Sequence, residues 1–375
     1  MTQTLTPPRA TLVISANSAW NIVNFRRALV EGLIAAGWRV IALAPDDGHA
    51  AAIKKLGAQF VPIRIDSSGT SVSRDAKLLL DYLRLLRRLR PQAFLGFTVK
   101  PNVYGSLAAR LLGIRAINNI SGLGTAFMGA GPLNRIVTRL YRLSLQKSAR
   151  VFFQNPHDLA LFVEKGLVQP DQAALLPGSG IDLERFRPSH RDRPTDRPFR
   201  FLFVGRLLRD KGLVEYAEAA RLLRPRWPAV EFAILGFAGS DNRSAVPIAE
   251  VERWQREGIV NYLGDTDDVR PFLQDANCVV LPSYREGLPR SLLEAAAMAR
   301  PMVATDVPGC RDLVTAGDNG MLCQARSAES LAAAMEAMLR LNSAERQAMG
   351  QRARERVERD FDQSIVVDAY LEALR

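Results

Sequence analysis

The chain has 375 residues, 47% of them hydrophobic and 24% charged, which is typical of globular proteins and long enough to favour two domains. It has three cysteines, Cys278, Cys310 and Cys323, which form no C-x-x-C pair, and few histidines. This pattern argues against a disulfide framework or a structural zinc site, and it favours a reducing compartment. Residues 1–10 have no apolar signal core and no run is long enough to span a membrane, so we expect a cytoplasmic protein.

The excess of positive charge lies entirely in the first half of the sequence. The net charge is +11, and residues 1–190 contain 24 lysines and arginines against 11 acidic residues. Residues 191–375 contain 26 against 28. This asymmetry indicates an acidic partner for the first half, either anionic lipid or nucleic acid, although an arginine-rich soluble surface has the same composition.

Short apolar runs alternate with helical patterns along the first half. Helices are predicted over 24–36, where Gly37 follows as a stop signal, and over 75–90. Four strands are predicted, at 11–15, 38–44, 59–63 and 93–97. Strands that alternate with helices of this length predict a parallel sheet covered on both faces.

The second half repeats this plan after a proline-rich, charged linker. A helix is predicted over 212–223, and the pattern over 343–375 is purely helical. Strands are predicted at 199–204, 230–235, 278–281 and 301–305. We therefore predict an α/β protein with two doubly wound, Rossmann-like domains around a cleft. The expected divisions are a first domain over 1–178, a linker over 179–198, a second domain over 199–355 and a terminal helix over 356–375.

The strongest functional signal lies in residues 281–299. A predicted buried strand is followed by a polar turn, and Pro289 suits the first position of a helix because its missing N–H would be unpaired there. Gly287 lets the backbone approach a ligand, and a helix N-terminus at the carboxyl edge of a parallel sheet is suited to a diphosphate. Glu286 precedes this helix, and Glu294 lies inside it, where its carboxylate could accept hydrogen bonds from ribose hydroxyls.

Two cations follow a strand in residues 204–212. Arg206 and Lys211 lie at a strand-to-helix turn, where they would neutralise the charge that builds on a departing diphosphate. Arginine offers a two-pronged contact and lysine a point charge. One such cation alone is usually a solvated surface residue, but the pair together with Glu286 and Glu294 favours a nucleotide-sugar site.

On these residues the sequence resembles the retaining glycosyltransferases of family 4, which have the GT-B fold. The resemblance rests on two glutamates eight positions apart and on the pattern G-R-x-x-x-x-K-G at 205–212, and it extends over the second half. It implies that Glu286 holds the donor sugar, that Glu294 binds ribose, and that the Arg206 and Lys211 pair binds the diphosphate. It also implies a terminal helix that crosses back onto the first domain. Further donor contacts are implied for Gly205, Leu263, Gly287, Leu288 and Pro289.

Residues 262–268 resemble the family's loop whose backbone contacts the nucleobase. Asp265 and Asp267 form a D-x-D tripeptide, which binds a divalent metal in another glycosyltransferase fold. Because Asp267 and Asp268 directly precede a helix predicted from Val269, we interpret the tripeptide as a capped turn. We expect no metal site and no cofactor beyond the UDP-sugar that serves as donor.

Three segments of the first half, 16–26, 98–106 and 118–125, follow predicted strands and should line the cleft. They resemble the bacillosaminyl-diphospho-undecaprenol N-acetylgalactosaminyltransferase subgroup of family 4, which extends lipid-linked sugars. The resemblance implies such an acceptor, and Lys100 is the candidate cation for its diphosphate, or else a surface lysine before a proline turn. Gly122 and Gly124 permit a tight loop near the donor or an ordinary turn. The residues assigned to the acceptor are Lys100, Asn17, Asn119 and Gly122.

His157 is the histidine most easily mistaken for a catalytic base. Asn155 is a capping residue, Pro156 suits the first helical position and Asp158 favours the helix dipole, so the segment reads as a helix start. We predict no general base here.

Basic residues mixed with leucine over 77–90 and 134–150 are typical of helices that rest on anionic lipid, or of an ordinary solvated face. Together with the resemblance, they predict a protein that is peripheral on the cytoplasmic face of the inner membrane. The basic segments lack the interleaved aromatic residues of single-strand nucleic-acid binders, so no nucleic-acid partner is expected.

The sequence thus predicts a retaining, metal-independent glycosyltransferase. It would move a hexose or N-acetylhexosamine from a UDP-sugar, with UDP favoured by analogy, to a polyprenyl-diphosphate-linked sugar in capsule, O-antigen or glycoprotein glycan assembly. One alternative is a sugar-nucleotide epimerase of the same fold, which would isomerise the donor without an acceptor. A more remote one is a basic lipid- or nucleic-acid-binding protein.

Overall fold

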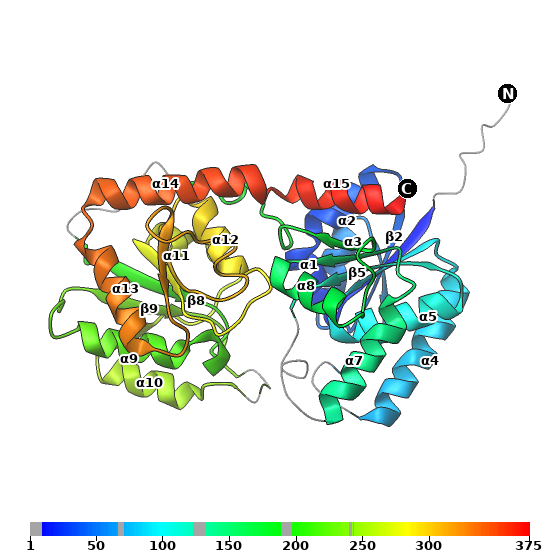
Figure 1. The fold of residues 1–375 in the computed structure, drawn as a ribbon, viewed down its shortest axis with the longest axis horizontal. Helices are drawn as coiled ribbons and strands as arrows, with labels where there is room; N and C mark the ends of the chain where they lie inside the picture. The colour runs from blue at the N-terminus through cyan, green and yellow to red at the C-terminus, as the bar shows by residue number, and fades with distance from the viewer. Residues whose placement is uncertain (1–9, 67–70, 123–131, 189–196, 240–241, 243) are drawn as a thin grey trace. The chain divides into compact units, whose positions relative to one another are not determined.

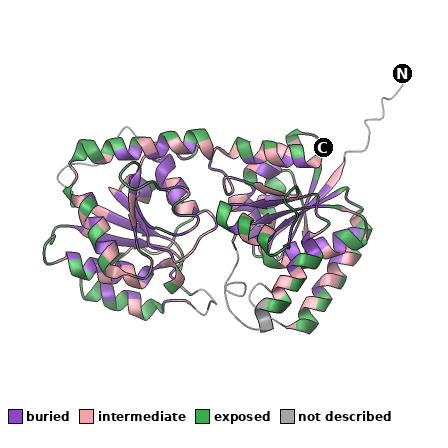
Figure 2. Cartoon of the chain, in the orientation of Figure 1, coloured by how far each residue is buried: buried purple, intermediate pink, exposed green. Residues whose placement is uncertain are grey.

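The computed structural model describes residues 10–66, 71–122, 132–188, 197–239, 242 and 244–375 (Figure 1). The chain divides into two compact units, Met1–Ser179 together with Gln363–Arg375, and Gly180–Asp362. In each unit the strands are the most deeply buried part, and the helices expose their outer faces (Figure 2). Within these described ranges, no helix is both long enough and apolar enough to cross a membrane.

The first unit is built on a seven-stranded parallel sheet in the order β3-β2-β1-β4-β5-β6-β7. The order reverses between β1 and β4, and ligands of open α/β sheets bind at the carboxyl ends of strands beside such a point. The strands are β1 (Thr11–Ser15), β2 (Arg39–Ala44), β3 (Gln59–Pro62), β4 (Ala93–Phe97), β5 (Arg115–Ile120), β6 (Arg150–Phe153) and β7 (Ala173–Leu175).

Helices cover both faces of this sheet. Leu12 and Ile14 of β1 face one cluster of buried side chains, which includes Tyr370, whereas Val13 faces the opposite cluster with Tyr82. This alternation is the period-two pattern of a strand that is buried on both sides. The helices are α1 (Ala19–Phe25), α2 (Arg27–Ala35), α3 (Ala50–Lys55), α4 (Val72–Leu89), the π-helix η1 (Pro101–Gly105), α5 (Ser106–Leu111), α7 (Pro132–Leu145), α8 (Pro156–Glu164) and α15 (Gln363–Leu374).

The helix predicted over 24–36 is wrong as a single element. The chain forms α1 and α2 instead, because Arg26 leaves the helical conformation with a φ of −127°. Its buried guanidinium lies 4.4 Å from the centre of the Phe97 ring. Helix α1 begins earlier than predicted because the Ser18 side chain accepts a hydrogen bond from the Asn21 amide, as an N-cap does.

The second unit has a six-stranded parallel sheet in the order β10-β9-β8-β11-β12-β13, which reverses between β8 and β11. The strands are β8 (Arg200–Val204), β9 (Glu231–Leu235), β10 (Asn261–Tyr262), β11 (Cys278–Leu281), β12 (Met302–Thr305) and β13 (Gly320–Cys323). The helices are the 3₁₀ turn η2 (Arg209–Lys211), α9 (Leu213–Leu223), α10 (Ile248–Arg256), α11 (Arg270–Gln274), α12 (Arg290–Ala297), α13 (Ala328–Arg340) and α14 (Ser343–Asp360).

The helical pattern over 343–375 is confirmed as two helices. Helix α14 begins with a capping box, in which Asn342 and Glu345 each accept a hydrogen bond from the other's backbone amide. Helix α15 belongs to the first unit, where Val366, Tyr370 and Ala373 are part of the buried core. Both units are therefore Rossmann-like α/β folds, as predicted. The expected linker includes 189–196, which lie outside the described residues.

Candidate active site

In the second unit, the turn after β8 is held tightly against the turn after β11. Gly212 has a φ of 71°, and a Cβ atom at this position would lie 2.0 Å from the Pro282 carbonyl oxygen. Only glycine permits both this conformation and this approach. The glycine directly follows the 3₁₀ turn that contains Lys211, so it fixes that lysine beside the segment predicted to bind the donor sugar.

The structure brings Lys211 and Glu286 into direct contact. The Lys211 ammonium forms an ion pair with Glu286 Oε1, and the side chains are only 22% and 11% exposed. Ser283 Oγ donates to the same oxygen over 2.7 Å, a contact that the sequence did not predict. Arg206, by contrast, is exposed, and its guanidinium has no hydrogen bond or ion pair with any described residue. Gly205 precedes it, with its amide bonded to the Leu235 carbonyl.

The helix after Glu286 begins one residue later than predicted. Pro289 is the N-cap rather than the first helical residue: its ψ is 116°, and its carbonyl accepts the amides of Leu292 and Leu293. Gly287 and Leu288 form the bend before it. Gly309, with a φ of 86°, packs against this bend, because a Cβ there would lie 2.6 Å from the Gly287 carbonyl oxygen.

Glu294 lies one turn inside α12, where its carboxylate is bonded to Arg290 and not to Glu286. Arg290 Nε donates to Glu294 Oε1 over 2.9 Å, and the carboxylate side chain is 13% exposed. Burial raises the pKa of the Glu294 carboxyl, while Arg290 and Arg185 oppose that rise and Asp268 adds to it. A carboxylate that is this deeply buried can accept hydrogen bonds from hydroxyl groups with little competition from water.

The predicted nucleobase loop continues the edge of the sheet. Leu263 donates its amide to the Ile234 carbonyl, and Gly236 donates its amide to the Gly264 carbonyl, both over 2.8 Å. The turn that follows is closed by Asp268, whose side chain accepts hydrogen bonds from the Arg270 amide and guanidinium. The hydrogen bonds from Arg270 lower the pKa of the Asp268 carboxyl below its usual value. Helix α11 begins at Arg270, one residue after the predicted start.

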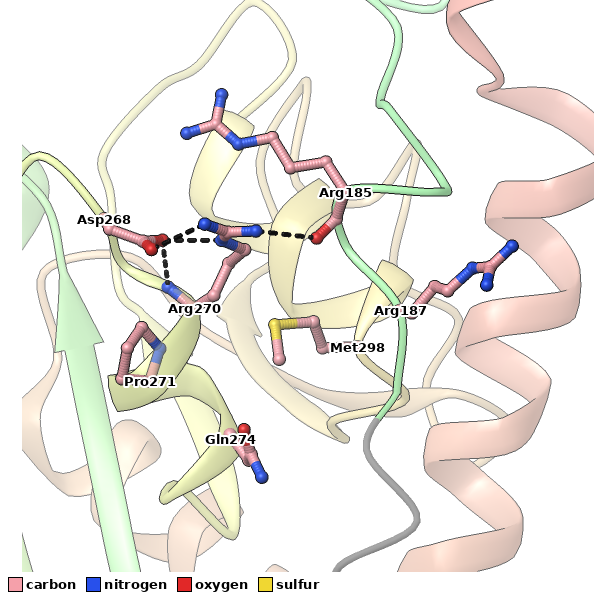
Figure 3. Close-up of a pocket in the computed structure, with 7 residues that line it drawn as sticks. All are labelled: Arg185, Arg187, Asp268, Arg270, Pro271, Gln274 and Met298. Atoms are coloured by element: carbon pink, nitrogen blue, oxygen red, sulfur yellow. Dashed lines mark hydrogen bonds and ion pairs between the residues drawn. The ribbon is translucent and has the colours of Figure 1, made fainter.

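A pocket of about 280 Å³ adjoins this turn (Figure 3). Figure 3 shows the Arg270 guanidinium between the Asp268 carboxylate and the Arg185 carbonyl, whereas the guanidinium of Arg187 points away. The pocket is lined by Arg185, Arg187, Asp268, Arg270, Pro271, Gln274 and Met298. Because Arg185 and Asp268 also act on the Glu294 carboxyl, the pocket and the predicted ribose site share two charged groups.

In the first unit, the structure places Lys100 differently from the prediction. It lies within a helical stretch that leads into η1, not in a loop, and its side chain is 12% exposed. Lys100 Nζ donates to Asp75 Oδ1 over 2.6 Å, and Tyr104 Oη donates to the other oxygen over 2.9 Å. A buried lysine needs such a partner. The sequence prediction missed Asp75 because it lies 25 positions away on α4.

The remaining predicted acceptor residues divide between a pocket and the core. Gly122 lines a pocket of about 230 Å³ together with Thr98 and Asn102, which belong to the predicted segment 98–106 but were not assigned individually to the acceptor. Asn17 donates its amide to Thr98 Oγ1. Asn119 is fully buried below this edge and bonded to other side chains. Gly124 of the same predicted loop lies outside the described residues.

The unusual backbone conformation of Thr98 marks the position of this pocket. Its φ of 65° is a genuine outlier for a β-branched residue, and a π-helix, a form enriched at functional sites, begins three residues later.

At the start of α8, Asn155 caps the helix by accepting a hydrogen bond from the Asp158 amide, and Pro156 takes the first helical position. The prediction that the His157 segment is a helix start is therefore confirmed.

The fold and this site define a class of protein. Two Rossmann-like α/β units, one with a lysine, a carboxylate and a helix N-terminus gathered at the carboxyl edge of its sheet, are the GT-B arrangement. Solved structures agree: HepE from Anabaena, crystallised with UDP-glucose, matches with a TM-score of 0.79 at 16% identity over 97% of this chain and 99% of its own. Sucrose-phosphate synthase from Thermosynechococcus elongatus matches at 0.77 and 19% identity over 97% and 98%.

Family models match both units. A glycosyl transferase 4-like domain covers residues 22–178, and a glycosyl transferases group 1 domain covers 198–341. The N,N'-diacetylbacillosaminyl-diphospho-undecaprenol alpha-1,3-N-acetylgalactosaminyltransferase of Campylobacter jejuni is 24% identical over 94% of both chains. The UDP-Gal:alpha-D-GlcNAc-diphosphoundecaprenol alpha-1,3-galactosyltransferase of Escherichia coli is 23% identical over 69% of both. The chain belongs to the family 4 glycosyltransferases of GT-B fold.

Proposed function

We propose that this glycosyltransferase moves a hexose or N-acetylhexosamine from a UDP-sugar to a polyprenyl-diphosphate-linked sugar, with retention of anomeric configuration and without a metal. The Lys211 and Glu286 contact at the carboxyl edge of the second sheet carries the proposal, because it joins a cation for a diphosphate to an acceptor for sugar hydroxyls. The names of two relatives, which both act on diphospho-undecaprenol sugars, support the acceptor class.

The proposed roles follow from the chemistry of each side chain. Lys211 and the exposed Arg206 would stabilise the charge that develops on the departing UDP, and the N-terminal end of α12 adds a partial positive charge. Glu286 would accept hydrogen bonds from the donor sugar and Glu294 from the ribose. Two cations near the diphosphate would oppose the charge that a metal ion otherwise neutralises, which supports transfer without a metal.

The acceptor hydroxyl would attack from the face that UDP leaves. A phosphate oxygen of the departing UDP takes the hydroxyl proton, the bond from the anomeric carbon to UDP breaks and the new glycosidic bond forms. No separate base is needed, which agrees with the capping role of the His157 segment. The pocket beside Thr98 and Gly122 is the proposed place of the acceptor sugar.

The test is a screen of UDP-hexoses and UDP-N-acetylhexosamines with a polyprenyl-diphosphate-linked sugar, read by mass and by proton NMR of the new linkage. We expect one added sugar with the anomeric configuration of the donor, and equal activity after treatment with a chelator. An inverted linkage would refute the mechanism. An isomerised donor in the absence of acceptor would identify an epimerase instead. Unchanged transfer by Glu286→Ala and Arg206→Ala would refute the assigned site.

We further propose that the first unit docks on anionic membrane, where a lipid-linked acceptor would lie. Residues 82–157 contain 12 lysines and arginines and no acidic residue. One exposed face of α7 combines cations with apolar side chains, a pattern of helices that lie at the lipid interface. This face consists of Arg135, Ile136, Arg139, Arg142 and Leu143.

Flotation with vesicles tests the docking. We expect binding to phosphatidylglycerol vesicles and little binding to phosphatidylcholine vesicles. Each cation removed from α7, as in Arg135→Gln or Arg139→Gln, should lower binding about fivefold, since one basic residue near the surface contributes about 1 kcal/mol. Equal binding of both variants and the native chain would show that this face does not contact lipid.

A further inference from the structure

Arg290 is fixed from two sides. It is the first residue of α12, four positions before Glu294, and its Nε donates to Glu294 Oε1 over 2.9 Å. Its Nη1 donates to the Gly180 carbonyl over 3.2 Å, and its side chain is 23% exposed. Gly180 is the first residue of the second unit. The guanidinium therefore ties the start of this unit to the carboxylate of Glu294.

The Glu294 carboxylate has one oxygen committed and one available. Arg290 supplies the only hydrogen bond that any described residue makes to Glu294, and it goes to Oε1. Its other charged neighbours are Arg185, from the segment before β8, and Asp268, from the turn before α11. Under the proposed function, Oε2 is the oxygen left to accept a hydrogen bond from the ribose, and the bond to Oε1 restricts how the carboxylate can rotate.

We infer that Arg290 is a positioning residue for nucleotide binding, which orients the Glu294 carboxylate toward the ribose through a fixed hydrogen bond. The inference rests on the proposed function, in which Glu294 binds ribose. Arginine suits the task because its planar guanidinium can bond two acceptors at fixed angles, here a carboxylate and a carbonyl, whereas lysine is a point charge.

Arg290 also affects the pH range over which the nucleotide binds. An ionised Glu294 carboxylate accepts hydrogen bonds from hydroxyl groups more strongly than the protonated form does, and burial already raises the pKa of this carboxyl. Arg290 opposes this rise together with Arg185, while Asp268 increases it. Loss of the Arg290 charge therefore raises the pKa further, so that nucleotide affinity is lost at a higher pH than in the native chain.

The test measures the affinity of the full chain for UDP by calorimetry between about pH 5 and about pH 8, a range above the ordinary pKa of glutamate. Arg290→Gln removes the charge, and Arg290→Lys keeps the charge but not the two-acceptor geometry. Arg253→Gln on α10 is a matched control, since Arg253 also lies four residues before a glutamate, Glu257, in the same unit.

We expect Arg290→Gln to weaken UDP binding about tenfold, the value of one charged hydrogen bond, and to move the acidic loss of affinity to higher pH. Arg290→Lys should weaken binding while leaving the pH of that loss near the native value. Turnover at saturating donor should change about twofold or less, because the contact is made equally before and during reaction. Arg253→Gln should bind as the native chain does.

Native affinity and pH dependence in Arg290→Gln would overturn the inference. So would a loss of affinity without a shift in pH that is accompanied by a lower melting temperature, since that pattern shows a structural role. Glu294→Gln that binds UDP normally would also overturn it, while leaving the site at Lys211 intact. A native chain that binds UDP but transfers no sugar refutes the proposed function alone, because the calorimetric comparison still decides the role of Arg290.

Discussion

Lys211 and Arg206 share a proposed role but differ in their surroundings, so their substitution should have different effects on stability. Lys211→Ala leaves the Glu286 carboxylate, which is 11% exposed, without its cation. Exposed pairs contribute about 0–1 kcal/mol, and loss of one partner of a buried pair costs about 3–5 kcal/mol. Since the Lys211 side chain is 22% exposed, we place the loss of unfolding free energy at about 1–2 kcal/mol.

Arg206→Ala removes an exposed guanidinium without a partner among the described residues, and it should leave the unfolding free energy within about 0.5 kcal/mol of the native value. For a unit of this size, the melting temperature should fall by about 2–8 °C in Lys211→Ala and hardly at all in Arg206→Ala. Transfer should fall in both variants by about 100-fold or more, because each removes charge stabilisation from the departing diphosphate.

The assay combines melting curves of the two variants with initial rates of sugar transfer. Addition of UDP gives a further comparison, since a ligand that binds the native state raises its melting temperature. The reasoning is refuted if Arg206→Ala melts lower than Lys211→Ala, or if either variant transfers sugar at the native rate.

Two other substitutions probe the surroundings of the sites. Gly309→Ala places a Cβ at a φ of 86° and 2.7 Å from the Glu286 carbonyl oxygen, so it should displace the bend that contains Glu286 and Gly287. We expect the KM for the donor, measured from initial rates, to rise more than tenfold, which corresponds to about 1.4 kcal/mol or more. Tyr370→Phe removes the hydroxyl that accepts a hydrogen bond from Asn119 Nδ2 over 3.3 Å. Denaturant titration should show an unfolding free energy about 1 kcal/mol lower than that of the native chain. The KM for the acceptor should rise, and the affinity for the donor should not change.

The elements that the sequence predicted well are those that depend on local pattern. The strand at 11–15 was placed correctly, and the predicted boundaries of the strands at 93–97 and 278–281 agree with β4 and β11. Buried parallel strands are short apolar runs between turn signals, so both ends are visible in the sequence. The candidate donor residues could be proposed for a similar reason, since Arg206, Lys211, Glu286 and Glu294 lie in two short segments.

The features that the sequence did not predict depend on contacts between distant residues. The break at Arg26 accompanies the packing of its guanidinium on Phe97, which lies 71 positions later. Lys100 was predicted to lie in a loop at the cleft, in a segment that follows a predicted strand. Proline at the first position of a helical turn is compatible with a helix, and the contact with Asp75 on α4 holds the lysine there. Neither contact leaves a trace in the local pattern.

The charges of the predicted sites neutralise one another in this structure. Lys211 is paired with Glu286 and Lys100 with Asp75, each pair within its own unit. Under the proposed function, a diphosphate at Lys211 would compete with Glu286, whose carboxylate is 11% exposed and would then need further hydrogen-bond donors. The hydroxyls of a sugar attached to that diphosphate are such donors. UDP alone would supply only the diphosphate, whereas a UDP-sugar would supply both the diphosphate and the sugar hydroxyls. If the assigned roles hold, we therefore expect this ion pair to favour binding of the complete donor over that of the spent nucleotide.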